Sequence, residues 1–459
     1  MENFWDFSVW GWFNVLAVLL MSLLAAKALK KVVPILNASL IPTSVLGGAM
    51  LLIVAGIYKL ITGDVMFDTP FFGASGTTTL EIITYHCLAL GFIASTLKAG
   101  GGKMTKKRTE EIFNTGVTTV STYLLQAIFG FAITMVAALI IKGFFPAAGV
   151  LLPFGFGQGT GQAMNYGNIY EQDFGFVGGK SFGLTIAALG FLSASLGGVV
   201  HLYILKKKGH ILDRGRGEDA ISAEEIQSKG EIPMQESMDK MTVQLAFIAL
   251  AYFIAQLLMI GLGKLIPGMK SVIYGFNFLL GVAAAAIVKA VLNFLNKRGL
   301  VRRRHTNDFL MTRCSNFFYD LMVVAGVAAI RLGILESYWG IMMILGVVGL
   351  FITYFYNLFV AKKLFPDYPQ EQFLMMYGML TGTASTGVIL LREIDGDFKT
   401  PAADNMVYQN LPAIVFGFPM MLLATLAPVK PALTMVILIA FFGVMNLILF
   451  RSVIFKRKK

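Results

Sequence analysis

Apolar runs of about twenty residues recur along the chain and constrain its fold more than any other feature. A run of that length crosses a hydrocarbon core of about 30 Å as an α-helix. The runs do not alternate apolar and polar residues, as the strands of a membrane β-barrel do. Only 14% of the residues are charged, whereas a soluble domain carries about 25%. The sequence therefore predicts an all-α polytopic membrane protein.

The net charge of +12 comes from short basic clusters that flank the apolar runs. This is the pattern of the positive-inside rule, and it argues against a nucleic-acid partner. All of the clusters fall on the cytoplasmic side if the chain crosses the membrane eleven times with its N-terminus outside and its C-terminus inside. The predicted spans cover about residues 9–29, 45–60, 80–97, 117–141, 182–205, 243–266, 272–294, 317–331, 339–360, 406–426 and 432–450.

The spans divide into two sets of five. Residues 1–205 and 241–428 each hold five spans, and a charged cytoplasmic linker, 206–240, separates them. Because five is odd, the second set begins on the opposite side, which predicts two inverted repeats. Residues 429–459 then form an extra C-terminal span and a basic tail.

Each repeat contains a glycine-rich segment too short to cross the membrane, at 150–166 and at 375–391. The motif Gly155-x-x-x-Gly159-Thr160 matches Gly378-x-x-x-Gly382-Thr383. Proline and glycine weaken helices, so we expect two re-entrant hairpins that enter from opposite faces and meet near the midplane. Paired small residues also serve as packing devices between spans, which is the alternative interpretation.

Interrupted helices in inverted repeats are typical of secondary transporters, whose half-helix ends bind the substrate and the ion. We expect Gln158 and Thr160 of the first tip to face Thr383 and Ser385 of the second. The candidate substrate-binding residues are Gln158, Gly159, Thr160, Gln162, Asn165, Thr381, Gly382, Thr383, Ser385 and Thr386.

A sodium site is predicted from oxygen-bearing groups in the second repeat. Pro412 has no N–H and frees the carbonyl of Tyr408, while Gln409 and Asn410 add side-chain oxygens. Asp320 is an ionisable group inside a span, a functional candidate by default. The alternatives are a purely structural kink and an Asp320 that is solvated near the interface. The two cysteines and four histidines have no ligand spacing, so no metal beyond sodium is expected.

Three segments resemble the bacterial glutamate:sodium symporter family: LIPTSVLGG (40–48), IASTLKAGG (93–101) and FGFGQGTGQA (154–163). The resemblance covers nearly the whole chain except the linker and the final span. It implies sodium-coupled uptake of glutamate, Na⁺ as the coupling ion, a homodimer and a bacterial inner membrane. Gln158 stands where the family usually has histidine, and Thr383 and Ser385 also depart from its second motif.

The leading hypothesis is therefore a symporter for glutamate or a related carboxylate that works by alternating access. The nearest alternative is a sodium-coupled carrier of the same plan for citrate or another hydroxy-acid. A channel is disfavoured because channels generally repeat by oligomeric symmetry. An enzyme is not expected, since the spans hold no Ser/His, HExxH or paired-Asp arrangement.

Overall fold

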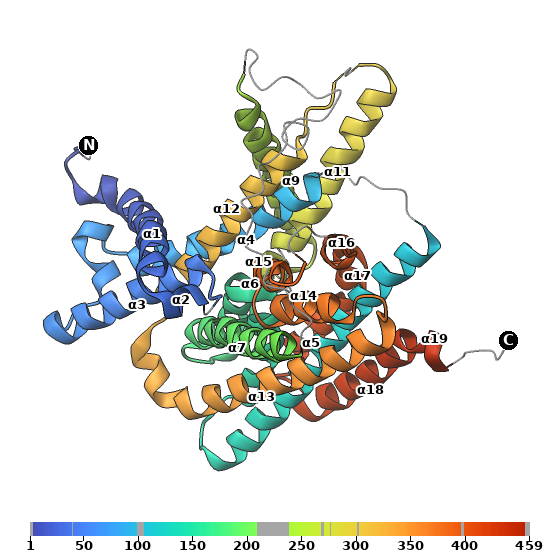
Figure 1. Ribbon diagram of the computed structural model, residues 1–459. Coiled ribbons are helices and arrows are strands. Elements are labelled where there is room, and N and C mark those ends of the chain that lie inside the picture. The colour runs from blue at the N-terminus through green and yellow to red at the C-terminus, as the bar shows by residue number, and fades with distance from the viewer. Residues whose placement is uncertain are drawn as a thin grey trace.

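The computed structural model describes residues 3–38, 40–98, 105–208, 238–267, 270–275, 277–300, 303–395 and 399–454 (Figure 1). Within these ranges the chain forms helices joined by turns, with no strand. The α-helices are α1 (Phe7–Val32), α2 (Pro34–Ala38), α3 (Thr43–Thr62), α4 (Gly76–Leu97), α5 (Lys106–Ile140), α6 (Leu151–Phe174), α7 (Gly179–Lys207), α9 (Lys240–Leu265), α10 (Lys270–Gly275), α11 (Asn277–Lys297), α12 (Asp308–Ala328), α13 (Leu332–Leu364), α14 (Pro369–Thr381), α15 (Ala384–Arg392), α16 (Ala402–Tyr408), α17 (Asn410–Leu426), α18 (Pro431–Leu449) and α19 (Arg451–Ile454).

Nine helices of the described chain are long and apolar enough to cross a membrane. They contain α1, α3, α4, α5, α7, α9, α11, α13 and α18. The prediction of a polytopic helical membrane protein is thereby confirmed. The predicted spans at 317–331 and 406–426 differ from the other nine. The first falls on α12, which carries Arg313 and Asp320, and the second is broken at Gln409 into α16 and α17.

Local chemistry fixes several helix ends. Side chains of Thr105, Asp239 and Asn307 accept hydrogen bonds from backbone N–H groups in the first turns of α5, α9 and α12. These groups would otherwise have no partner inside the helix. At the other end, Gly63 and Gly175 close α3 and α6 with φ of 82° and 70°. Glycine adopts this left-handed conformation without steric cost, so each helix stops there.

The helices pack in two groups (Figure 1). The first helix group consists of α1, α3, α4, α9, α11 and α12. The second helix group consists of α5, α6, α7 and α13 to α18. The groups meet where α6 packs on α4 and α12 and where α7 packs on α12, while the short α10 contacts both. Most of the predicted linker, 206–240, lies outside the described residues.

Candidate functional site

The first glycine-rich segment forms α6, which is broken near its middle. Gly159 has φ 78° and ψ −171°, a conformation open to glycine and strongly disfavoured for residues with a Cβ. The helix resumes directly after it and continues to Phe174. The break leaves backbone groups without their helical partners at a position that is buried in the protein.

The second glycine-rich segment forms α14 and α15, separated by Gly382 and Thr383. Gly382 has φ −138° and ψ −104°, and Thr383 is extended, with φ −143° and ψ 172°. The first turn of α15 therefore presents free N–H groups and the positive end of its dipole, while α14 presents free carbonyls. Both ends of the break carry partial charge that suits a polar ligand.

The two breaks meet. A methyl group added to Gly159 would lie 3.4 Å from Cγ2 of Thr383 and 4.0 Å from the carbonyl oxygen of Gly382. The hydroxyl of Thr160, however, donates to the carbonyl of Met322 at 3.2 Å. Thr160 is thus engaged with α12, a member of the first helix group, rather than with Thr383.

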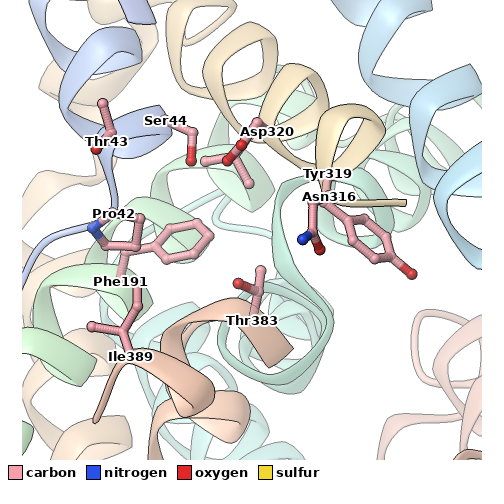
Figure 2. Close-up of a pocket in the computed structure, with 10 residues that line it drawn as sticks. Pro42, Thr43, Ser44, Phe191, Asn316, Tyr319, Asp320, Thr383 and Ile389 are labelled. Carbon is pink, nitrogen blue, oxygen red and sulfur yellow. The ribbon is translucent and has the colours of Figure 1, made fainter. Parts of the chain in front are cut away.

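A cavity of about 240 Å³ opens beside the meeting point, between the two helix groups (Figure 2). Its walls come from the start of α3, the middle of α12, and from α7 and α15 of the second group. The lining residues are Pro42, Thr43, Ser44, Phe191, Asn316, Tyr319, Asp320, Val323, Thr383 and Ile389. The predicted residues Thr383 and Asp320 therefore contribute to one cavity, which also contains polar residues that the sequence did not single out.

Asp320 is the one charged side chain among the described residues that line this cavity. It is exposed to the cavity and hydrogen-bonded to the hydroxyl of Ser44. Figure 2 places Ser44 and Asp320 together on one wall, with Thr383 on the wall below them. Helices α3 and α15 both have their N-terminus at this cavity: α3 begins at Thr43, and α15 begins directly after Thr383. The site thus combines one carboxylate with two positive helix ends.

Other predicted substrate residues point elsewhere. Asn165 donates to the carbonyl of Gly275 in α10 at 3.2 Å and to Oε1 of Gln162 at 3.4 Å. The hydroxyl of Thr381 donates to Tyr377 within its own helix. The remaining members of the set are placed as follows: Thr386 is buried with its hydroxyl 3.4 Å from that of Thr383, Gln158 is partly buried at the break, and the side chain of Ser385 lies outside the described part of the chain.

The predicted sodium residues do not converge. Gln409 is buried at the junction of α16 and α17, where its Oε1 accepts from Thr119 of α5 at 2.9 Å. Asn410, the next residue, is exposed, and Tyr408 ends α16. Asp320 instead lies on α12 in the cavity against α3. The two parts of the predicted site are separated because α16 packs on α5 and α14 in the second helix group, whereas α12 belongs to the first.

An ion cluster centred on the buried Glu81, which the sequence analysis missed, also bridges the two groups. Glu81 of α4 accepts from Nζ of Lys180 at 2.6 Å and from the guanidinium of Arg331 at 3.0 Å. Lys180 begins α7, and Arg331 precedes α13. The backbone N–H of Arg331 also donates to the hydroxyl of Ser181 at 3.3 Å. Lys180 and Arg331 lie 99 and 250 residues from Glu81 in the chain, so no local sequence pattern predicts the cluster.

Fold and site together define a helical membrane protein with a polar cavity between two packed helix groups. Comparison of the chain with protein-family models, with curated proteins and with solved structures found no match. The geometry of the cavity and its surroundings is therefore the main ground for a functional assignment.

Proposed function

We propose that the protein is a secondary transporter that couples Na⁺ to the uptake of glutamate or a related amino-acid carboxylate by alternating access. The observation that carries the proposal is the contact between two helix breaks, at Gly159 and Thr383, beside a cavity at the boundary of two helix groups. Broken helices that meet at such a boundary are the usual substrate and ion sites of secondary transporters. A channel or an enzyme would not require this arrangement.

Packing between helices supports two inverted repeats. Within the first half α1 packs on α3, and within the second half α9 packs on α11; between the halves α3 packs on α12, and α11 packs on α4. The pairs α4 with α12 and α5 with α13 join the halves. A two-fold axis that exchanges the halves would generate these contacts. We assign α6 and α14–α15 as the re-entrant segments and α18 as the extra span.

The chemistry of the cavity favours an amino acid over citrate. Asp320 offers a carboxylate to an ammonium group, and the N-termini of α3 and α15 suit carboxylates. Glutamate carries one ammonium and two carboxylates, so each feature has a partner. Citrate has no ammonium and would bring only further negative charge near Asp320.

The cavity and the ion cluster of Glu81 lie at two different levels of the boundary between the helix groups, which supports alternating access. Lys27, Lys30 and Lys31 line a pocket that shares Thr43 with the cavity, and under the positive-inside rule these lysines support a cytoplasmic position for the cavity. Arg331 follows Asp320 by 11 residues, about 16 Å at the helical rise, so its pair with Glu81 lies toward the outer side. In this arrangement the outer side is closed, and uptake requires Glu81 to separate from Lys180 and Arg331.

The same proposal includes a bacterial inner-membrane location, eleven spans with the N-terminus outside and the C-terminus in the cytoplasm, and a homodimer. The topology rests on the basic clusters, and the dimer and the membrane rest on the family resemblance. Labelling of single cysteines placed near each terminus tests the topology. Labelling of both termini from one side would contradict it.

The direct test is uptake by purified protein in liposomes, with sodium or potassium gradients and a panel of glutamate, aspartate and citrate. We expect glutamate to accumulate only when the sodium gradient points inward. Accumulation of citrate without glutamate would replace the substrate assignment. Passive flux of glutamate that is independent of sodium would contradict the transporter proposal and favour a channel.

A further inference from the structure

Four buried polar side chains meet where α5 crosses α13. Nε2 of Gln126 donates to the hydroxyl of Thr353 at 2.8 Å, and Nδ2 of Asn357 donates to the hydroxyl of Thr122 at 3.3 Å. Each is at most 1% exposed. Thr122 and Gln126 are four residues apart on α5, as are Thr353 and Asn357 on α13, so each pair lies on one helix face. The two bonds are therefore reciprocal across the crossing.

The amide oxygens of this cluster have no hydrogen-bond partner in the described structure. These atoms are Oε1 of Gln126 and Oδ1 of Asn357. A buried acceptor without a partner destabilises the fold, and here two occur within one set of mutually bonded side chains. Oδ1 of Asn277 also lacks a partner, but Asn277 lies in the first helix group, where its amide donates to the carbonyl of Tyr85 and, among the described residues, is not bonded to another amide side chain. The α5–α13 cluster is thus unusual in gathering several oxygens.

The end of α14 adds negative potential at the same place. Nε2 of Gln126 also donates to the carbonyl of Leu380 at 2.9 Å. Leu380 lies in the last turn of α14, just before the break at Gly382, where helix carbonyls lack helical donors. The C-terminal end of a helix dipole favours a cation. A cation next to Gln126 and Asn357 would therefore gain from both the oxygens and the dipole.

We propose that the four side chains at the α5–α13 crossing form a binding site for one sodium ion, with Oε1 of Gln126 and Oδ1 of Asn357 as ligands and the hydroxyl oxygens of Thr122 and Thr353 completing the set. Hard cations prefer oxygen ligands, and none of these ligands is a carboxylate, which favours a monovalent over a divalent ion. Coupling of this ion to glutamate rests on the proposed function; the binding itself does not.

Thermal unfolding of the purified protein tests the site without transport. In sodium chloride the wild-type Tm should exceed that in potassium chloride of equal ionic strength, because a ligand stabilises the state that binds it. The variant Asn357→Leu should raise the sodium concentration for half-maximal stabilisation at least tenfold. Asn277→Leu, which removes an equally buried amide elsewhere, should leave it unchanged.

A second variant keeps the test decisive if Asn357→Leu does not fold. Asn357→Asp places a formal charge among the same oxygens, so sodium should bind more tightly and calcium should begin to stabilise the protein. A wild-type Tm indifferent to the choice of sodium or potassium would overturn the site. The site would also be overturned if the sodium dependence of Tm were unaltered in Asn357→Leu or, where that variant cannot be purified, in Asn357→Asp.

Transport assays separate this inference from the proposed function. If both hold, Asn357→Leu raises the sodium requirement while the KM for glutamate at saturating sodium changes less than twofold. Sodium stabilisation that depends on Asn357, without any glutamate uptake, would support the sodium site and contradict the proposed substrate. Glutamate uptake with an unchanged sodium requirement in Asn357→Leu would contradict the sodium site and support the proposed transporter.

Discussion

Two carboxylates, Glu81 and Asp320, face the same boundary between the helix groups in opposite circumstances. Glu81 is buried and neutralised by Lys180 and Arg331. Asp320 is hydrogen-bonded to Ser44 and exposed to a cavity. A carboxylate that already holds two cationic side chains serves to join helices. A carboxylate that faces an open space beside two positive helix ends is available to a ligand with a cationic group.

The largest effect is expected from Asp320→Asn. Loss of a hydrogen bond to a charged group costs about 1.5–3 kcal/mol, or roughly 10- to 150-fold in affinity. The KM for glutamate should rise by that factor in liposome uptake, with expression maintained. Asp367→Asn is the control, because Asp367 is an exposed carboxylate that pairs with Lys107, and neither residue lines the cavity. Equal kinetics in the two variants would show that Asp320 does not contact the substrate.

Glu81→Gln should have the next largest effect, on conformation rather than on binding. Two partly exposed ion pairs are lost, each of about 1 kcal/mol, so the closed arrangement should be less populated by roughly thirtyfold. The measurement is the rate at which a water-soluble maleimide labels Ser181→Cys, with Cys87 and Cys314 replaced. Ser181 is 3% exposed, so its labelling reports opening at this end.

The control for Glu81 is Glu111→Gln. Glu111 is also buried, but it pairs with Arg108 on the same helix, α5, and so does not hold the two groups together. Its loss should leave the labelling rate of Ser181→Cys unchanged. A rate that rises equally in both variants would mean that general loosening, not the ion cluster, exposes this end.

The smallest effect concerns the two threonines of the helix breaks. Thr383→Val removes a hydroxyl from the cavity wall and should raise the KM for glutamate about fivefold, or about 1 kcal/mol. Thr160→Val should change the KM less than twofold, because its hydroxyl is bonded to Met322. Uptake kinetics of the two variants measured side by side decide this. A larger effect for Thr160 than for Thr383 would reverse the roles of the breaks.

Much of the fold was predictable, because hydropathy and basic clusters depend on local sequence. The repeated glycine motif predicted interrupted helices in both segments, and the structure places the breaks at Gly159 and Gly382. The orientation of Thr160 did not, since it depends on a neighbour from another helix: Gly326 lacks a side chain, and a methyl group there would lie 2.6 Å from Cβ of Thr160. The missing side chain lets Thr160 pack on α12.

The site was predictable only in part for a related reason. Thr383 and Asp320 stood out as polar groups in broken or apolar segments, whereas Ser44 became relevant only once α3 was placed against α12. Gln126 and Asn357 are isolated polar residues inside apolar runs, so they hardly change the mean hydropathy of the segments that contain them. The recurrence of Thr-Tyr-x-x-Gln at 122–126 and Thr-Tyr-x-x-Asn at 353–357 is the signal that could have revealed them.

The assignment of the first and last long helices to different groups has a practical consequence. α1 packs on α3 in the first helix group, and α18 packs on α5 in the second. Fluorophores on these two helices would therefore label different helix groups, and energy transfer between them would report any displacement of one group against the other. Single-molecule measurements of this distance would test for such a displacement without a label in the cavity.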